Sequence, residues 1–174
     1  MTEPLGPLEL VGDRWVIGDP YRREGACLVL TADGMEHHKL AASEPLAVIP
    51  WSRFVDGPSV WATARAWSAT RTAGVLLDTL ATRTVAGPRA CSVLAYLRHP
   101  YEDVLITYTH HERRYPFLHI SLLDILLRKT TEAKAAHRLG DPAWLGEAVA
   151  RVAAIRSGRR PERAVAEIIA DLNS

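Results

Sequence analysis

The chain has 174 residues, of which 48% are hydrophobic and 24% charged, so it is long enough to bury a core and is too apolar to be disordered. A formal net charge of +1 argues against general polyanion binding by electrostatics alone. No apolar run approaches the ~20 residues of a membrane span and the N-terminal segment has no signal-peptide pattern, so we expect a soluble cytoplasmic protein without a membrane partner.

Short apolar runs separated by turn residues predict strands in the first third of the chain. Leu8–Val11 and Trp15–Ile17 flank a turn that begins at Gly12. Glycine at the first central position of a two-residue turn suits the type II′ geometry of tight hairpins. We therefore predict that these two runs pair as an antiparallel hairpin.

A second hairpin is predicted where Ala26–Thr31 and Met35–Leu40 flank the pair Asp33-Gly34. An Asp-Gly pair between two apolar runs favours a turn in which both central residues have φ > 0. Leu46–Pro50 follows as a further strand, and it ends at its proline because proline cannot donate to a ladder.

Residues 59–84 fit either strand or helix, and within them residues 74–84 suit a short helix better. A clear strand pair comes next, with Cys91–Leu97 and Val104–Thr109 joined by residues 98–103. That connection has the length of a hairpin loop and contains a proline that stops the ladder.

The apolar period changes to that of helices after residue 115. Pro116 suits the first position of a helix, and Gly140 is a plausible C-terminal cap. Asp141-Pro142 predicts the start of a second helix that ends at Gly158, and Pro161 opens a third.

These patterns predict an α+β fold in one domain. Residues 1–114 are expected to form a bent, mainly antiparallel sheet, and residues 115–174 three helices packed on it. We expect Cys27 and Cys91, which lie in apolar runs, to be buried reduced thiols.

The segment Val48–Phe54, with its apolar-Pro-Trp sequence a dozen residues after an Asp-Gly hairpin, resembles the bacterial pleckstrin-homology-like domains. The resemblance covers at most residues 8–138. It implies a bent sheet closed by a C-terminal amphipathic helix, a role that Phe117–Arg138 could take, and a binding or assembly module without catalytic residues. The two helices expected after Gly140 depart from that family's pattern.

Ionisable residues at the ends of the strand 104–108 are the candidates for catalysis. They are His99, Asp103, His110, His111 and Glu112. The first two precede this strand and the other three follow it, so we expect the two groups to lie about 15–20 Å apart. His110 or His111 beside Glu112 could act as an acid/base pair, because histidine titrates near working pH.

No sequence motif enforces a metal site, a nucleophile or a nucleotide-binding loop. We therefore predict no metal and no cofactor. A metal-dependent or acid/base hydrolase-like enzyme that uses the residues around 99–112 is kept as an alternative function.

Aromatic and basic residues offer two further kinds of site. Trp51, Trp61 and Trp67 could line a ligand pocket, although aromatic residues on strands more often belong to the core. Four C-terminal arginines could contact nucleic-acid phosphates: Arg156, Arg159, Arg160 and Arg163. Acidic residues are interspersed among them, so nucleic acid is the less favoured partner.

The leading hypothesis from sequence is a non-enzymatic binding or assembly module that self-associates through a sheet edge or a helical face. It depends on a full-sized core combined with no convergent set of polar residues. The partner or ligand is left open at this point.

Overall fold

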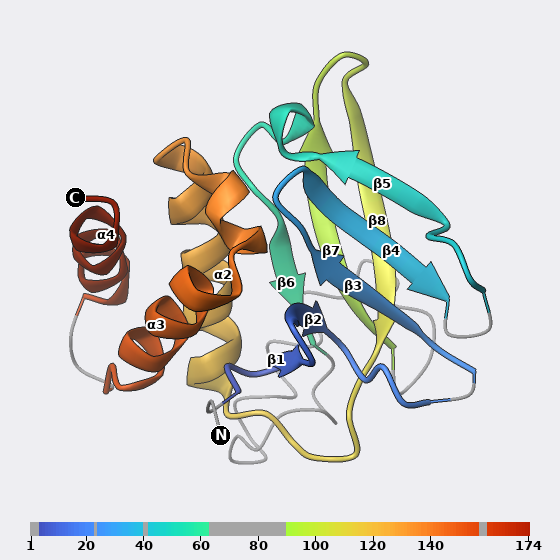
Figure 1. Ribbon diagram of the computed structural model, residues 1–174, viewed down its shortest axis with the longest axis horizontal. Coiled ribbons are helices and arrows are strands. Elements are labelled where there is room, and N and C mark those ends of the chain that lie inside the picture. The colour runs from blue at the N-terminus through green and yellow to red at the C-terminus, as the bar shows by residue number, and fades with distance from the viewer. Residues whose placement is uncertain (1–3, 23, 40–41, 63–89, 157–159) are drawn as a thin grey trace, which may run out of the picture.

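The fold is α+β with antiparallel strands followed by three helices, as the sequence predicts, but the strands form two sheets rather than the single bent sheet that was expected (Figure 1). A computed structural model describes residues 4–22, 24–39, 42–62, 90–156 and 160–174. In the five-stranded sheet the order is β1 (Leu8–Val11), β2 (Arg14–Ile17), β3 (Ala26–Leu30), β4 (Gly34–Lys39) and β5 (Ala47–Pro50). The three-stranded sheet contains β6 (Ser59–Trp61), β7 (Ala90–Leu97) and β8 (Glu102–Thr109).

The helical layer contains α2 (Phe117–Glu132), α3 (Pro142–Ala153) and α4 (Pro161–Leu172). Two short 3-10 helices, η1 (Trp51–Arg53) and η3 (Ala136–Gly140), complete the elements. Figure 1 shows the helices on one side of the molecule and the strands on the other. None of the helices in the described part of the chain combines the length and apolarity that a bilayer span requires.

The first hairpin forms as predicted. Val11 pairs with Arg14, and Gly12 takes φ +64° while Asp13 stays out of the positive-φ region. One positive φ at the first central position is the type II′ pattern, so Gly12 has the conformational role that the sequence suggested.

The second hairpin also forms, but for a different reason from the one predicted. Leu30 pairs with Met35, and neither Asp33 nor Gly34 has a positive φ. A Cβ on Gly34 would instead lie 2.2 Å from the carbonyl oxygen of Ile49 on β5. Glycine is therefore required there because a neighbouring strand approaches closely.

Each of the helices α2, α3 and α4 begins at or beside a proline, and α3 also has a side-chain cap. Pro116 occupies the N-cap of α2 rather than the first helical position that the sequence suggested. The Asp141 carboxylate accepts hydrogen bonds from the backbone N–H groups of Ala143 and Trp144, so the predicted cap of α3 is confirmed. Pro161 opens α4 as expected.

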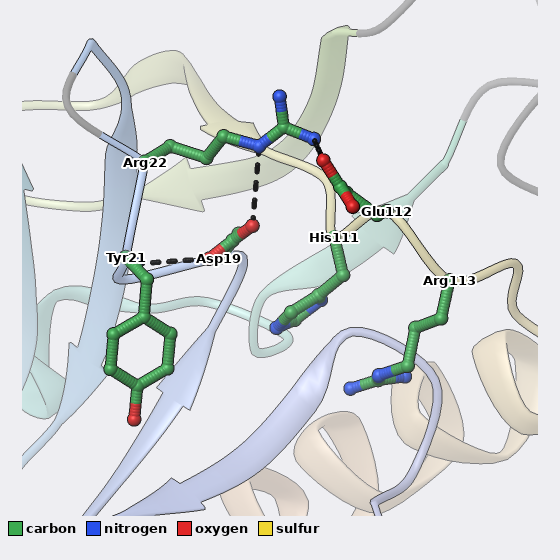
Figure 2. A pocket seen from close by; sticks show the side chains of 6 residues that line it. All are labelled: Asp19, Tyr21, Arg22, His111, Glu112 and Arg113. Carbon is green, nitrogen blue, oxygen red and sulfur yellow. Dashed lines mark hydrogen bonds and ion pairs between the residues drawn. The ribbon is translucent and has the colours of Figure 1, made fainter.

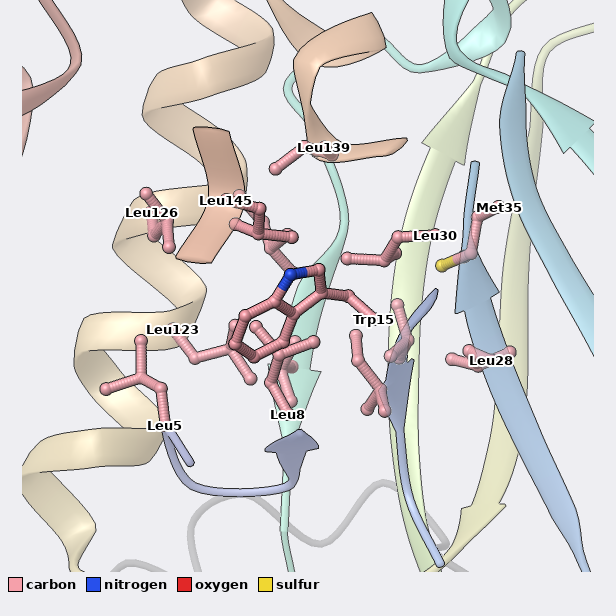
Figure 3. Packing of buried hydrophobic residues seen from close by; sticks show 14 of the residues in the cluster. Leu5, Leu8, Trp15, Leu28, Leu30, Met35, Leu123, Leu126, Leu139 and Leu145 are labelled. Carbon is pink, nitrogen blue, oxygen red and sulfur yellow. The ribbon is translucent and has the colours of Figure 1, made fainter. Parts of the chain in front are cut away.

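The core lies between the sheets and the helices. Trp15, 1% exposed, is at its centre, and Figure 3 shows the indole between the leucines of α2 and α3 and Leu30 of β3. Its Nε1–H donates to the carbonyl oxygen of Pro142 at 3.2 Å, which ties β2 to the start of α3. Cys27 and Cys91 are buried and are not joined by a disulfide.

Part of the region that was ambiguous in the sequence forms β6, which pairs with β7. The helix suggested for residues 74–84 lies outside the described residues. Helix α2 packs along β6, and the Asp124 Oδ1 accepts hydrogen bonds from Ser59 Oγ–H at 2.8 Å and from the Val60 N–H at 3.0 Å. This carboxylate occupies a backbone donor at the edge of the three-stranded sheet.

Candidate functional site

The candidate catalytic residues lie at opposite ends of β8, as the sequence predicts. His99 is in the turn before this strand and Asp103 is near its start, and both are exposed. His110, His111 and Glu112 follow its last residue, Thr109, at the other end of the strand. The two groups therefore do not form one site.

An open cleft of ≈470 Å³ lies where β8 ends (Figure 2). It is lined by Asp19, Tyr21, Arg22, His111, Glu112 and Arg113. The Asp19 N–H donates to the carbonyl oxygen of Thr109 at 2.7 Å, which holds the β2–β3 connection against the end of β8. His111 and Glu112, which were candidates from the sequence, thus lie beside residues that were not candidates.

Ion pairs cross this cleft. The Asp19 carboxylate accepts a hydrogen bond from the Tyr21 N–H at 2.9 Å and one from Arg22 Nε at 3.4 Å. The Arg22 guanidinium also donates to Glu112 Oε1 at 3.2 Å. Glu112 is therefore paired with an arginine rather than with the neighbouring histidine that the acid/base alternative would require.

His111 is buried beside this ion pair, with 8% of its side chain exposed. Its backbone N–H donates to Tyr115 Oη at 2.7 Å, and its Nδ1 lies 2.6 Å from the same oxygen. Its Nε2 lies 3.1 Å from Glu9 Oε1, although the contact lacks the alignment of a good hydrogen bond. Both ring nitrogens thus face side chains of the protein.

Glu9 also connects this imidazole to a guanidinium. Arg113 donates to Glu9 Oε2 at 2.9 Å and to the carbonyl oxygen of Gly6 at 2.8 Å, and it lies over the ring of Tyr115 at 5.2 Å. The segment between β8 and α2 is thereby tied to the strand at the start of the fold.

Burial determines the ionisation of this cluster. It lowers the pKa of His111 below its usual value, and the Arg113 charge acts in the same direction while Glu9 opposes it. Burial likewise raises the pKa of Tyr115. At neutral pH His111 is therefore neutral and Tyr115 protonated, an arrangement that suits hydrogen bonding inside the protein better than proton transfer to a bound molecule.

The part of the chain that the structure describes contains no group of three or more His, Cys, Asp or Glu side chains placed to hold a metal ion. His110 contacts the carbonyl oxygen of its neighbour His111 through Nδ1. The chemistry available at the end of β8 is thus a set of hydrogen bonds and ion pairs that join three chain segments.

The tryptophan candidates separate into different environments. Trp51 is 8% exposed, contacts Phe54 in a tilted arrangement with ring centroids 5.3 Å apart, and donates its indole N–H to Thr31 O at 2.8 Å, so it belongs to the core. Trp61 on β6 is 44% exposed. Trp67 lies outside the described residues.

Trp61 is one of a group of apolar side chains on the outer surface of the three-stranded sheet. We name this surface the β6–β8 face; its apolar members are Val55, Trp61, Leu94, Tyr96 and Leu105. Leu94 and Leu105 pair directly across β7 and β8, and Tyr96 and Trp61 lie diagonal to them. The Val55 N–H donates to Tyr96 O at 2.9 Å, which places this residue beside the strand.

The face is exposed as well as apolar. Between 44% and 47% of the surface of Val55, Trp61, Tyr96 and Leu105 is accessible. Alternate residues of the same strands, such as Val93 and Ile106, are in the core. The sequence identified only Trp61 here. β7 has apolar residues at both odd and even positions, so the sequence does not show which of them face the core and which face outward; packing in the fold decides this.

The C-terminal arginines are partly neutralised. Arg163 Nε donates to Glu167 Oε1 at 2.8 Å, while Arg156 and Arg160 are exposed on either side of the α3–α4 connection. Nearby, Arg151 pairs with Asp171 at 2.6 Å. Arg159 lies outside the described residues. The described arginines therefore share this region with acidic partners.

No protein-family model, curated protein or solved structure matches the chain. The resemblance to pleckstrin-homology-like domains accordingly stays a prediction.

Proposed function

We propose that the chain is a non-enzymatic binding or assembly module whose binding surface is the β6–β8 face. The observation that carries this proposal is the grouping of Trp61, Tyr96 and Leu105, each more than 40% exposed, on one side of a single sheet. Contiguous exposed apolar patches are typical of interaction sites, and tryptophan and tyrosine are enriched among the residues that dominate binding energies.

The magnitude of this surface sets the expected strength of binding. The three side chains expose roughly 250–300 Å² in total, which corresponds to about 6–8 kcal/mol of gross hydrophobic stabilisation when covered. Association costs about 4–15 kcal/mol in lost freedom. The face alone therefore supports weak binding, and a partner must contribute apolar area of its own.

The contacts at the end of β8 also support a non-enzymatic role. The most histidine-rich region of the chain buries His111 against Glu9 and Tyr115, and pairs the exposed Glu112 with Arg22. These contacts suit a structural junction, since they occupy the groups that an acid/base mechanism would need to keep available.

A photo-crosslinking amino acid, p-benzoylphenylalanine, placed at residue 96 tests the proposal in the cells that produce the chain. We expect ultraviolet light to give a defined protein adduct from this position. The same replacement of Tyr21, which is 77% exposed and lies at the cleft, serves as the matched control and should give none. Adducts from position 21 alone, or from neither position, would contradict the proposal.

A further inference from the structure

We infer that the partner on the β6–β8 face is a second copy of this chain, packed face to face about a two-fold axis. The inference rests on the proposed function, and it adds the identity of the partner. Leu94 and Leu105, which pair directly across β7 and β8, lie at the centre of the contact. Trp61 and Tyr96 flank them diagonally.

The distribution of charge favours a second copy. In a two-fold interface the same patch meets itself, so a charge near the axis would face its own kind. The polar residues of outward parity on these strands are Ser59, Asp103 and Thr107, together with Ser92, which is only 1% exposed. Asp103 is the one ionisable residue among them, and it lies opposite Tyr96 at the end of the strand pair. Arg53 and Arg98 lie at the Val55 end of the face. Arg53 pairs with Glu102 at 2.6 Å and Arg98 donates to the carbonyl oxygens of Ser52 and Phe54, so both guanidinium groups are already engaged within the chain rather than offered to an anionic partner such as nucleic acid or an acidic membrane.

The shape of the sheet favours packing through its face. β7 and β8 each have eight residues, so the face is about 26 Å long, and two sheets stack about 10 Å apart. A second copy contributes an equal apolar area, so the area covered is twice that of one face. It therefore meets the requirement that the partner contribute apolar area of its own. The area per copy still falls short of the ~800 Å² of a standard interface, so we expect a micromolar dimer.

The sheet edges are less suited to self-association. β5 lies at an edge, but it has four residues and ends at Pro50, which has no N–H to donate. At the β6 edge, Asp124 already accepts the Val60 N–H. Short strands, prolines and covering side chains are the features by which proteins avoid strand addition. The outer face is therefore a better place for a second copy than the β5 edge or the β6 edge.

Sedimentation velocity from about 1 μM to about 1 mM, the range in which small interfaces dissociate, tests the inference. We expect the chain to pass from monomer to dimer in this range. Leu105→Glu, which places two carboxylates near the axis, should raise the dissociation constant at least about tenfold, a cost of ~1.4 kcal/mol. Val48→Glu is the matched control, since Val48 is 51% exposed on β5, and it should leave the constant unchanged.

Circular dichroism of each variant checks that the fold is kept, and Trp61→Ala provides a second perturbation of the face without an added charge. Monomers at every concentration would overturn the inference, as would a dimer that Val48→Glu weakens and Leu105→Glu does not. The crosslinking experiment separates the two proposals. An adduct from position 96 to a different protein supports the binding module and rejects the second copy, whereas no adduct rejects the binding module itself.

Discussion

Asp124 on α2 joins the helical layer to the edge of the three-stranded sheet, and its removal should be among the more costly polar substitutions in the protein. A single carboxylate oxygen accepts from Ser59 Oγ–H at 2.8 Å and from the Val60 N–H at 3.0 Å. Val60 is 5% exposed, so water has little access to its N–H once the acceptor is gone. We predict that Asp124→Ala lowers the free energy of unfolding by about 2–4 kcal/mol.

The magnitude follows from two contributions. An unsatisfied buried donor costs about 1–3 kcal/mol, and a hydrogen bond to a charged acceptor contributes about 1.5–3 kcal/mol. The two values overlap, because the cost of leaving the donor unsatisfied is part of what is lost with the hydrogen bond, so the total is less than their sum. Asp124→Asn keeps an oxygen acceptor at the same place and loses only the charge, so it should cost roughly half as much.

Urea unfolding of Asp124→Ala, Ser59→Ala and the double variant measures these values and the coupling between the two side chains. We expect a coupling of about 1 kcal/mol, since the Ser59 hydroxyl makes its described hydrogen bond to this carboxylate. A cost below about 0.5 kcal/mol for Asp124→Ala, together with strictly additive single variants, would refute the claim that this carboxylate fastens β6 to α2.

Two further predictions concern His111 and the glycines of the hairpins. Because burial lowers the folded-state pKa of His111, the unfolded chain binds more protons near this pKa, so stability should fall as the pH decreases below about 6.5. The loss should be smaller in His111→Gln, as measured by urea unfolding at several pH values; an identical pH dependence in both proteins would contradict the assignment. Gly34→Ala places a Cβ 2.2 Å from the Ile49 carbonyl oxygen and should cost more than about 3 kcal/mol. Gly12→Ala meets no atom within 4 Å and should cost only about 1–2 kcal/mol for its positive φ; equal melting temperatures of the two variants would argue against the close approach of β5.

Local signals were sufficient to predict most of the elements. The cap at Asp141, the proline at the start of α4 and the glycine at position 12 act on their immediate neighbours, so their effect is visible in the sequence itself. The role of Gly34 was predicted wrongly because it depends on β5, which lies further along the chain and approaches only in the folded state.

The candidate site was harder to predict because its contacts are long-range. The sequence allowed His110 or His111 to pair with Glu112. In the structure His111 lies against Glu9 of β1, while Glu112 pairs with Arg22 from the β2–β3 connection. Nothing in the spacing of these residues indicates such partners. The outward parity of Tyr96 was equally hidden, since β7 is apolar on both faces.

The indole of Trp15 has a consequence for the order in which the chain folds during synthesis. Its acceptor, the carbonyl of Pro142, is separated from it by 127 positions, and Gly140 packs so closely on Ala32 that a Cβ there would lie 2.0 Å from the Ala32 nitrogen. The first hairpins leave the ribosome long before these partners and must wait with apolar side chains uncovered. Closure of the core is therefore a late event that requires most of the polypeptide, and contacts of such sequence separation are the ones that slow folding.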